Sequence, residues 1–355
     1  MSNSSKFFEE TMNAIQINNM LLVIAFGFIF LTGGVGNLLV IYVFGFKKKL
    51  CHRITADWLI LYLGVVDFLS SIFNPPLYIY FTLTRHQQWH FGKLGCKILP
   101  ALGPIMSSIS FGVLLIFAID RYLAIVSPVK GSVLSWKSVT AAFITDIILS
   151  YCGYLHYILG LKISSGIKNN DICEAPEEIF SYSIANSILI SFRFIFFVTV
   201  FTFTTVKIHI QLKKCQHTSF SRELQRKHRK DSKAILFVLI VMGAVFSLLV
   251  FPKEILHLVY SLSWLKNNNG ISHTPMLLRI SSWLKALHTA NSCANVFIYS
   301  KMHKVYRKQI FQLFYHIFCK KEYLRQRYFI KLNIIPKSDR TFKFCKDVKQ
   351  SAFYK

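Results

Sequence analysis

The sequence predicts an all-α protein, a bundle of seven transmembrane helices followed by a short amphipathic eighth helix. Three observations predict it: an excess of apolar residues, their grouping into long blocks, and the position of basic residues between the blocks. Of the 355 residues, 53% are hydrophobic and 16% are charged. A soluble domain carries about 25% charged residues, so one core surrounded by water does not account for this composition.

Seven apolar blocks follow one another along the chain, separated by short polar stretches. The first, Met20–Phe46, contains no charged residue, and a helix needs roughly 20 apolar residues to cross a bilayer. The others lie at about 56–83, 94–126, 138–161, 179–206, 234–264 and 274–300. The first block is too long for a signal peptide and lacks a small-residue cleavage site, so we interpret it as a spanning helix.

Basic residues give the blocks a direction across the membrane. The net charge is +26, and 30 of the 42 Lys and Arg residues follow blocks one, three, five and seven. These basic stretches are Lys47–Arg53, Lys130–Lys137, Lys207–Lys233 and Lys301–Lys355. Since cytoplasmic loops carry the basic excess, we expect a multi-pass plasma-membrane protein with an extracellular N-terminus and a cytoplasmic C-terminus. Anionic lipid of the bilayer then accounts for the charge, and no nucleic-acid partner is expected.

The chain divides into one membrane domain and three shorter parts. We assign residues 1–19 to an extracellular segment, 20–300 to the seven-transmembrane domain, 301–318 to the amphipathic helix and 319–355 to a basic cytoplasmic tail. In residues 301–318, apolar side chains recur at helical spacing between basic ones. This pattern is typical of a helix that lies on the membrane surface.

Three covalent modifications are consistent with this topology. Asn3 begins an Asn-Ser-Ser sequence for N-glycosylation on the outer side. Cys96 and Cys173 both face the oxidising side, where a disulfide between them can form. Cys319 ends the amphipathic helix, and a cysteine beside the membrane is a candidate for palmitoylation. The alternative for Cys319 is an unmodified thiol.

Charged residues inside the apolar blocks are candidates for function. Asp120 and Arg121 stand side by side at the inner end of the third block, and Asp67 lies deep in the second. Charges in a membrane are costly and often functional. On its own, the Asp120–Arg121 pair can also be an interfacial anchor, because an arginine near a helix end can reach the membrane surface.

Five motifs give these residues a context. They are GNLLV at 36–40, LYLGVVDFL at 61–69, WHFG at 89–92, AIDRYLAIVSPVK at 118–130 and NSCANVFIY at 291–299. In this order, within seven spans, the set resembles the rhodopsin-like (class A) G-protein-coupled receptors. The resemblance covers nearly the whole chain up to about residue 318.

The resemblance implies a receptor for an extracellular ligand that activates a heterotrimeric G protein, with arrestin as a further partner. The implied activation switch comprises Asp120, Arg121, Tyr122, Tyr299, Phe246 and Pro252. Asp120 would hold Arg121 at rest, and activation would free Arg121 to meet the G protein. The family's disulfide would join Cys96 to Cys173.

A polar cluster around Asp67 is also implied by the resemblance. The matching positions are Asn37, Ser110, Ser292 and Asn295. Oxygen ligands of this kind suit a hard cation, so we expect Asp67 to bind an allosteric sodium ion, with no other cofactor. The alternative is a protonated Asp67 held by hydrogen bonds without an ion.

Several positions depart from the family pattern. Val296 replaces a proline of the seventh span, and Val250 replaces a tryptophan before Pro252. Spans four and five lack the usual prolines, and Ser232 stands where an acidic partner of Arg121 is often found. These departures leave open a decoy or scaffold receptor that does not signal, although the intact Asp-Arg-Tyr sequence argues against it.

The outer halves of the spans contain the residues expected to meet the ligand. They are Gly103, Arg193, Lys253, Glu254, His257, Lys285 and His288. Gly103 replaces the aspartate of amine receptors, and Lys285 lies too high to hold retinal. Three fixed positive charges against one negative charge favour an anionic ligand group. The alternative is that Lys253 pairs with an acid and Lys285 points outward.

A second signal favours a peptide. Four acidic residues lie beside Cys173 and could steer a basic peptide; they are Asp171, Glu174, Glu177 and Glu178. The motif at 291–299 is also most common in peptide receptors. We therefore expect a peptide ligand first, and a small anionic metabolite or lipid second.

Two other classes of protein fit less well. A transporter would need repeated halves and a charged path through the membrane, whereas no repeat is visible and the midplane charge is chiefly Asp67. An enzyme is not expected, because no metal-ligand or nucleophile cluster with workable spacing occurs in the sequence.

Overall fold

The computed structural model describes most of the chain. The described backbone covers residues 2–47, 53–126, 134–165, 171–174, 180–214, 222–266, 274–302 and 304–315. Side chains are described within these ranges except at 2–12, 14, 214, 222–235, 302, 304, 305 and 314. The predictions for the side chains of Asn3 and Ser232, and for Glu177, Glu178 and Cys319, therefore fall outside the described residues.

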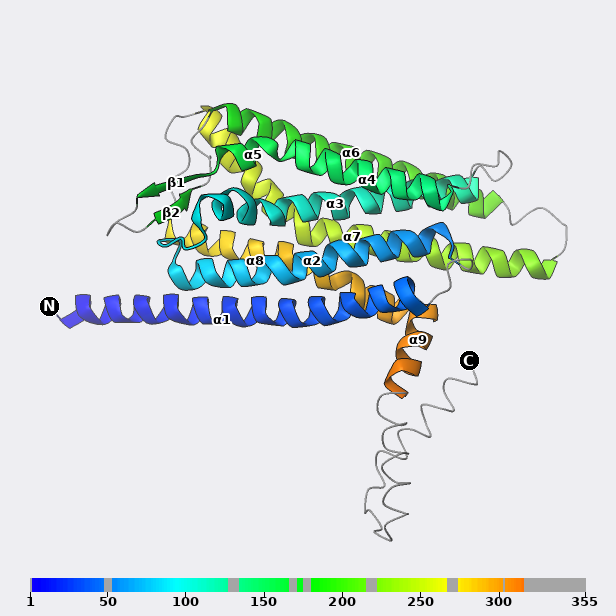
Figure 1. Ribbon diagram of the computed structural model, residues 1–355, viewed down its shortest axis with the longest axis horizontal. Coiled ribbons are helices and arrows are strands. Elements are labelled where there is room, and N and C mark those ends of the chain that lie inside the picture. The colour runs from blue at the N-terminus through cyan, green and yellow to red at the C-terminus, as the bar shows by residue number, and fades with distance from the viewer. Residues whose placement is uncertain are drawn as a thin grey trace, which may run out of the picture.

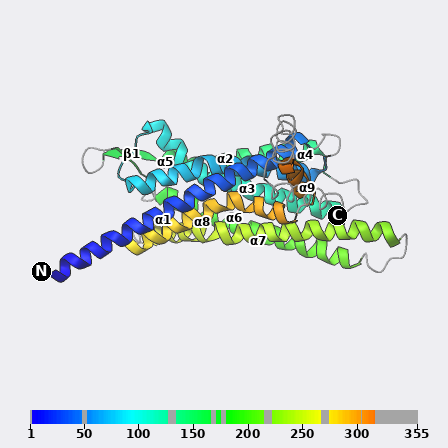
Figure 2. The same ribbon diagram turned by 90° about the horizontal axis from the view of Figure 1, so that it is seen from below.

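Long helices lie side by side in one bundle, as Figure 1 and Figure 2 show from two directions. The long helices are α1 (Ser2–Ile41), α2 (Thr55–Thr84), α3 (Gly92–Val126), α4 (Trp136–Gly153), α6 (Phe180–Lys214), α7 (Arg222–Lys266) and α8 (Pro275–Met302). Two shorter helices are α5 (Leu155–Gly160) and α9 (Lys304–Phe314). A π-helical turn, η1 (Tyr42–Lys47), continues α1. The predicted all-α fold with seven membrane helices and a short eighth helix is confirmed.

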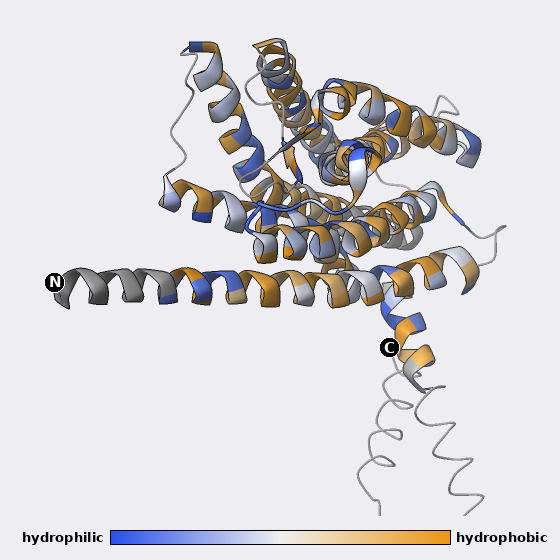
Figure 3. Cartoon of the chain, turned by 60° about the vertical axis from the view of Figure 1, so that its left-hand side comes forward, coloured by the Kyte–Doolittle hydropathy of each residue, from blue (hydrophilic) through white to orange (hydrophobic). Residues whose placement is uncertain are grey.

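The bundle presents apolar side chains outward, as a membrane protein must. In the described part of the chain, six helical segments are long and apolar enough to cross a bilayer, beginning with Ile15–Lys47 and ending with Leu236–Lys266. The seventh spanning helix is the one labelled α8. It has 28 residues, and it is less apolar because it contains Arg279 and Lys285. Figure 3 shows apolar residues along the length of the helices. In water such surfaces would be an aggregation hazard.

Helix α3 lies at the centre of the bundle. It contacts α2, α4, α6 and α7. In the most apolar stretch of α3, 72% of the residues are buried inside the bundle. The corresponding share within Trp136–Gly160, which covers α4 and α5, is 17%. Side chains projecting from α3 therefore meet most of the other helices, whereas α4 lies at the edge.

A small hairpin and a disulfide mark one end of the bundle. Strand β1 (Lys162–Ser165) pairs antiparallel with β2 (Asp171–Glu174), with Ile163 opposite Cys173. Cys173 forms the predicted disulfide with Cys96 at the start of α3, and their Cα atoms lie 5.6 Å apart. We call this the hairpin end. The opposite end carries α9, which points away from the bundle axis in Figure 1, and we call it the α9 end.

Some predicted boundaries differ from the structure. Helix α1 begins at Ser2 rather than near Met20, because residues 2–19 contain no Gly or Pro to interrupt it. The fourth block is not one helix: it is divided at Tyr154, whose φ of −96° and ψ of 6° end α4 before α5 begins. The basic stretch before the sixth span is also partly helical, since α7 begins at Arg222.

Close packing of α1 against α8 depends on one glycine. A Cβ atom added at Gly36 would lie 2.6 Å from Cγ1 of Val296, which is closer than two carbon atoms can approach. Val296 is the position where the family has a proline, and it is buried at 9% exposure. The valine therefore fills the space that the missing side chain of Gly36 leaves.

We expect Gly36→Ala to destabilise the protein by about 1–3 kcal/mol, because overpacking forces α1 and α8 apart. Thermal unfolding of the purified protein in detergent, followed by circular dichroism, would show a lower Tm. Val296→Ala in the same chain should restore part of the loss. Gly27→Ala is the matched control, since a Cβ there meets nothing within 4 Å. Equal Tm values for Gly36→Ala and Gly27→Ala would contradict this packing.

Candidate functional site

Asp120 and Arg121 form a buried ion pair near the α9 end of α3. The Nε atom of Arg121 donates to Oδ2 of Asp120 at 2.9 Å, and its Nη2 atom contacts the same oxygen. Thr55, the first residue of α2, accepts from Arg121 Nη2 and donates to Asp120 Oδ2, both at 3.1 Å. Asp120 is 1% exposed and Arg121 8%. The arginine is thus held by its neighbour and by a second helix.

Two tyrosines of the predicted switch lie near this end of the bundle. Tyr122 packs against Phe203 of α6, with ring centroids 5.8 Å apart. Tyr299 is fully buried, and its hydroxyl has no hydrogen-bond partner among the described residues. Its ring lies 6.3 Å from that of Tyr306 in α9. Burial raises the pKa of Tyr306 to about 12, so this hydroxyl is protonated at neutral pH.

Phe246 lies in an aromatic cluster between α3, α6 and α7. Its ring centroid is 6.2 Å from that of Phe111, 5.7 Å from Phe197 and 6.1 Å from Phe251. Pro252 follows Phe251 within α7. Val250, which replaces the family's tryptophan, is completely buried in the same core. The structure thus places Phe246 and Pro252 together, and their role in switching remains a prediction.

Asp67 is enclosed by neutral donors from two other helices. Ser110 Oγ of α3 donates to Oδ1 at 3.1 Å, and Asn295 Nδ2 of α8 donates to Oδ2 at 2.9 Å. Asp67 is 1% exposed. Each carboxyl oxygen therefore has a hydrogen bond from a different helix.

The two other predicted members of this cluster lie one step further away. Asn37 donates to the backbone oxygen of Ser292 at 2.6 Å. Ser292 Oγ in turn accepts from Ser71 at 2.9 Å. The side-chain oxygen of Asn37 is buried and has no hydrogen-bond partner among the described residues. The oxygen atoms in this cluster belong to one carboxylate, to hydroxyl groups and to amide groups. Oxygen ligands of these kinds fit a hard cation.

Arg193 and Glu254 form a second ion pair, nearer the hairpin end. Arg193 Nη1 of α6 lies 3.6 Å from Glu254 Oε2 of α7, and His288 Nε2 of α8 lies 3.8 Å from Oε1. Arg193 also donates to the hydroxyl of Tyr154 and lies over the ring of Phe111, 5.3 Å from its centroid. The partner of Glu254 is thus Arg193 on another helix, and not Lys253 beside it.

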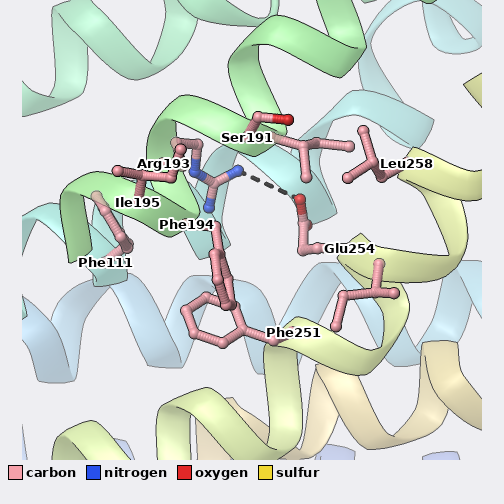
Figure 4. A pocket seen from close by; sticks show the side chains of 10 residues that line it. Phe111, Ser191, Arg193, Phe194, Ile195, Phe251, Glu254 and Leu258 are labelled. Atoms are coloured by element: carbon pink, nitrogen blue, oxygen red, sulfur yellow. Dashed lines mark ion pairs between the residues drawn. The ribbon is translucent and has the colours of Figure 1, made fainter. Parts of the chain in front are cut away.

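The remaining residues of the predicted ligand set do not gather in one cavity. Arg193 and Glu254 line a cavity of about 320 Å³ between α6 and α7, shown in Figure 4. His257 lines a separate small cavity with Asn186 and Trp264. The other members line neither cavity: these are Gly103, Lys253, Lys285 and His288.

Sequence reasoning missed three residues of these polar centres. Thr55 bridges Asp120 and Arg121, and Tyr154 accepts from Arg193. Asp146 of α4 is an electrostatic neighbour of Arg193, and a buried oxygen of its carboxyl group has no hydrogen-bond partner among the described residues. Of these three residues, Asp146 could have been found from the sequence, because it is an acidic residue inside an apolar block.

Comparison with known families agrees with this architecture. The model of the family "7 transmembrane receptor (rhodopsin family)" matches residues 36–299. This range includes α2 to α7 completely, the last residues of α1 and nearly all of α8. It also includes the Asp67, Asp120 and Glu254 centres. The chain therefore belongs to the rhodopsin family of seven-transmembrane receptors.

Individual relatives are distant. The human C5a anaphylatoxin chemotactic receptor 1 is 30% identical over 156 residues, which are 42% of this chain and 43% of that receptor. The chain thus spans less than half of that relative's length in the match. The mouse neuropeptide Y receptor type 6 is 25% identical over 90% of this chain and 86% of its own. Melanopsin of Phodopus sungorus is 28% identical over 81% of this chain and 60% of its own.

Removing the charge of Glu254 should destabilise the protein strongly. Glu254→Gln leaves Arg193 buried without its carboxylate, and breaking a buried pair in this way costs about 3–5 kcal/mol. The double variant Arg193→Gln/Glu254→Gln should recover part of this loss. Thermal unfolding of the purified protein in detergent measures both.

The matched control is Glu174→Gln at the hairpin. Glu174 lies 3.9 Å from Lys162, but their side chains are 43% and 63% exposed. Exposed ion pairs contribute about 0–1 kcal/mol, so the Tm should change little. A Glu254→Gln variant as stable as Glu174→Gln would show that the Arg193–Glu254 pair does not hold α6 to α7.

Proposed function

We propose that this protein is a cell-surface receptor that binds an extracellular peptide at its hairpin end and activates a heterotrimeric G protein at its α9 end. The observation that carries the proposal is the Asp120–Arg121 pair, held by Thr55 near the α9 end. An arginine held by removable contacts is a two-state element, which a ligand and a partner can bias from opposite ends. Arrestin would compete for the same end.

A peptide is the ligand that the comparisons favour. The names of two relatives refer to C5a anaphylatoxin and to neuropeptide Y. At the hairpin end, Asp171 is exposed and available to a basic peptide, whereas Glu174 already lies beside Lys162.

This function requires the orientation that the basic residues predict. The hairpin end would face the extracellular medium, where the Cys96–Cys173 disulfide is stable. Arg307 and Lys308 of α9 are exposed and would lie at the anionic inner surface of the plasma membrane. Glycosylation of Asn3 and palmitoylation of Cys319 fit this orientation.

Ligand-free signalling tests the proposal without a known ligand. Arg121→Ala should abolish basal activity in cells that carry sensors for each major class of G protein. Arg279→Ala, near the hairpin end of α8, is the control and should keep it. Activity that survives in Arg121→Ala would contradict the proposed switch. A silent wild-type chain that reaches the surface would favour the decoy receptor.

We also propose that Asp67 binds a sodium ion, with oxygen atoms of Ser110, Ser292, Asn295 and Asn37 around it. A ligand that binds only the folded state stabilises it. We therefore expect the Tm of the purified protein to rise in sodium chloride relative to choline chloride at equal concentration. Asp67→Asn should remove the difference. A rise of equal size in both salts would favour a protonated Asp67 without an ion.

A further inference from the structure

The cavity between α6 and α7 is open toward the lipid. Its lining includes Ile195, which is 63% exposed, and Ile255, which is 50% exposed. Large apolar side chains exposed on spanning helices face the bilayer. A molecule dissolved in the membrane can therefore reach this cavity sideways, without passing through the hairpin end.

The walls of the cavity are apolar apart from a few groups. Figure 4 shows the rings of Phe194 and Phe251 close together, Ile195 and Leu258 at opposite sides of the view, and the Arg193–Glu254 pair between these two side chains. A cavity of about 320 Å³ lies at the lower end of the size range for small-molecule sites. Such a site suits a single apolar chain with one polar end group.

Arg193 has donors that the protein does not satisfy. A guanidinium group carries five N–H donors. One reaches Tyr154, while the Glu254 carboxylate lies at 3.6 Å, too far for a good hydrogen bond. The Nε atom of Arg193 is buried and has no hydrogen-bond partner among the described residues. A buried arginine with an unpaired donor in a cavity wall indicates a missing acceptor.

The charges around the cavity favour an anionic acceptor. Lys253 of α7 is an electrostatic neighbour of Arg193 on α6 and of Lys285 on α8. Glu254 and Asp146 are the acidic groups near Arg193. Arg193 is thus the basic group in the cavity wall, and the two lysines add positive charge in the same part of the bundle. A carboxylate is the planar anion that a guanidinium binds best through two parallel hydrogen bonds.

We propose that this cavity binds a single-chain anionic amphiphile of the fatty-acid type, which enters from the bilayer. Its carboxylate meets Arg193 and completes the hydrogen bonds that Glu254 leaves open. Its hydrocarbon chain lies against Phe194, Phe251 and Ile195 and extends into the lipid. This site is additional to the peptide site proposed at the hairpin end.

Photolabelling of the full-length protein in cell membranes tests the proposal. The probe is a long-chain fatty acid that carries a diazirine and an alkyne. We expect mass spectrometry to find the label on peptides that contain Ile190–Ile195 and Phe251–Leu258. Excess oleate should remove the label, and methyl oleate should compete about tenfold less well, because it cannot form the charge-assisted hydrogen bonds.

Matched tryptophan variants separate this cavity from general lipid contact. Ile195→Trp fills the cavity from its lipid side and should remove the label. Ile148→Trp lies on the lipid-facing side of α4, at a residue that is 56% exposed and does not line the cavity, so the label should persist. Surface staining confirms that both variants fold. Ile255→Trp serves as a second cavity variant on α7.

Three results would overturn the proposal. They are label spread evenly over all lipid-facing helices, label unchanged in both Ile195→Trp and Ile255→Trp, and equal competition by oleate and methyl oleate. The readout is binding and needs no signalling. A failure of the receptor proposal, in which Arg121→Ala still signals, therefore leaves this test intact, and the reverse also holds.

Discussion

Charged groups buried in an apolar bundle must find partners, and in this protein the partners come from other helices. Asp120 on α3 is bonded by Thr55 on α2 as well as by Arg121 beside it. Arg193 on α6 faces Glu254 on α7. An unpartnered charge in such a place costs several kcal/mol, so each of these contacts fixes the position of one helix against another. The bundle geometry follows from them as much as from apolar packing.

Helix α3 connects these polar centres because it is the most buried helix. It supplies Asp120 and Arg121 near the α9 end, and Ser110 to the cluster around Asp67. It also supplies Phe111, whose ring lies beneath Arg193 and beside Phe246. A displacement at the Arg193 centre would therefore meet the aromatic cluster before it reached the α9 end. Contiguous packing of this kind suits a receptor that responds at one end to an event at the other.

The departures from the family pattern are accommodated by packing. Val250 is completely buried beside the aromatic cluster, and Val296 occupies the space above Gly36. Neither substitution leaves the site empty, so the fold is retained without the usual tryptophan and proline. The change at position 296 affects the backbone, because valine has the backbone N–H donor that proline lacks.

The sequence by itself determined the all-α fold and its seven spans. Through the resemblance to the receptor family it also implied the Asp120–Arg121 pair, the Cys96–Cys173 bond and the neighbourhood of Asp67, of which Ser110 and Asn295 bond to Asp67 directly. The fold follows from the length of the apolar blocks, and the resemblance rests on short motifs, each of which is local in the chain. Only the tertiary structure decided that Glu254 pairs with Arg193 and that Thr55 bridges the Asp120–Arg121 pair. It also decided that the fourth apolar block is divided at Tyr154 into α4 and α5. The partners in these contacts lie up to 66 residues apart, on faces set by helix rotation and packing. No local sequence pattern encodes helix rotation or packing. A charged residue inside an apolar block can therefore be recognised in the sequence, whereas its partner is identified only in the folded bundle.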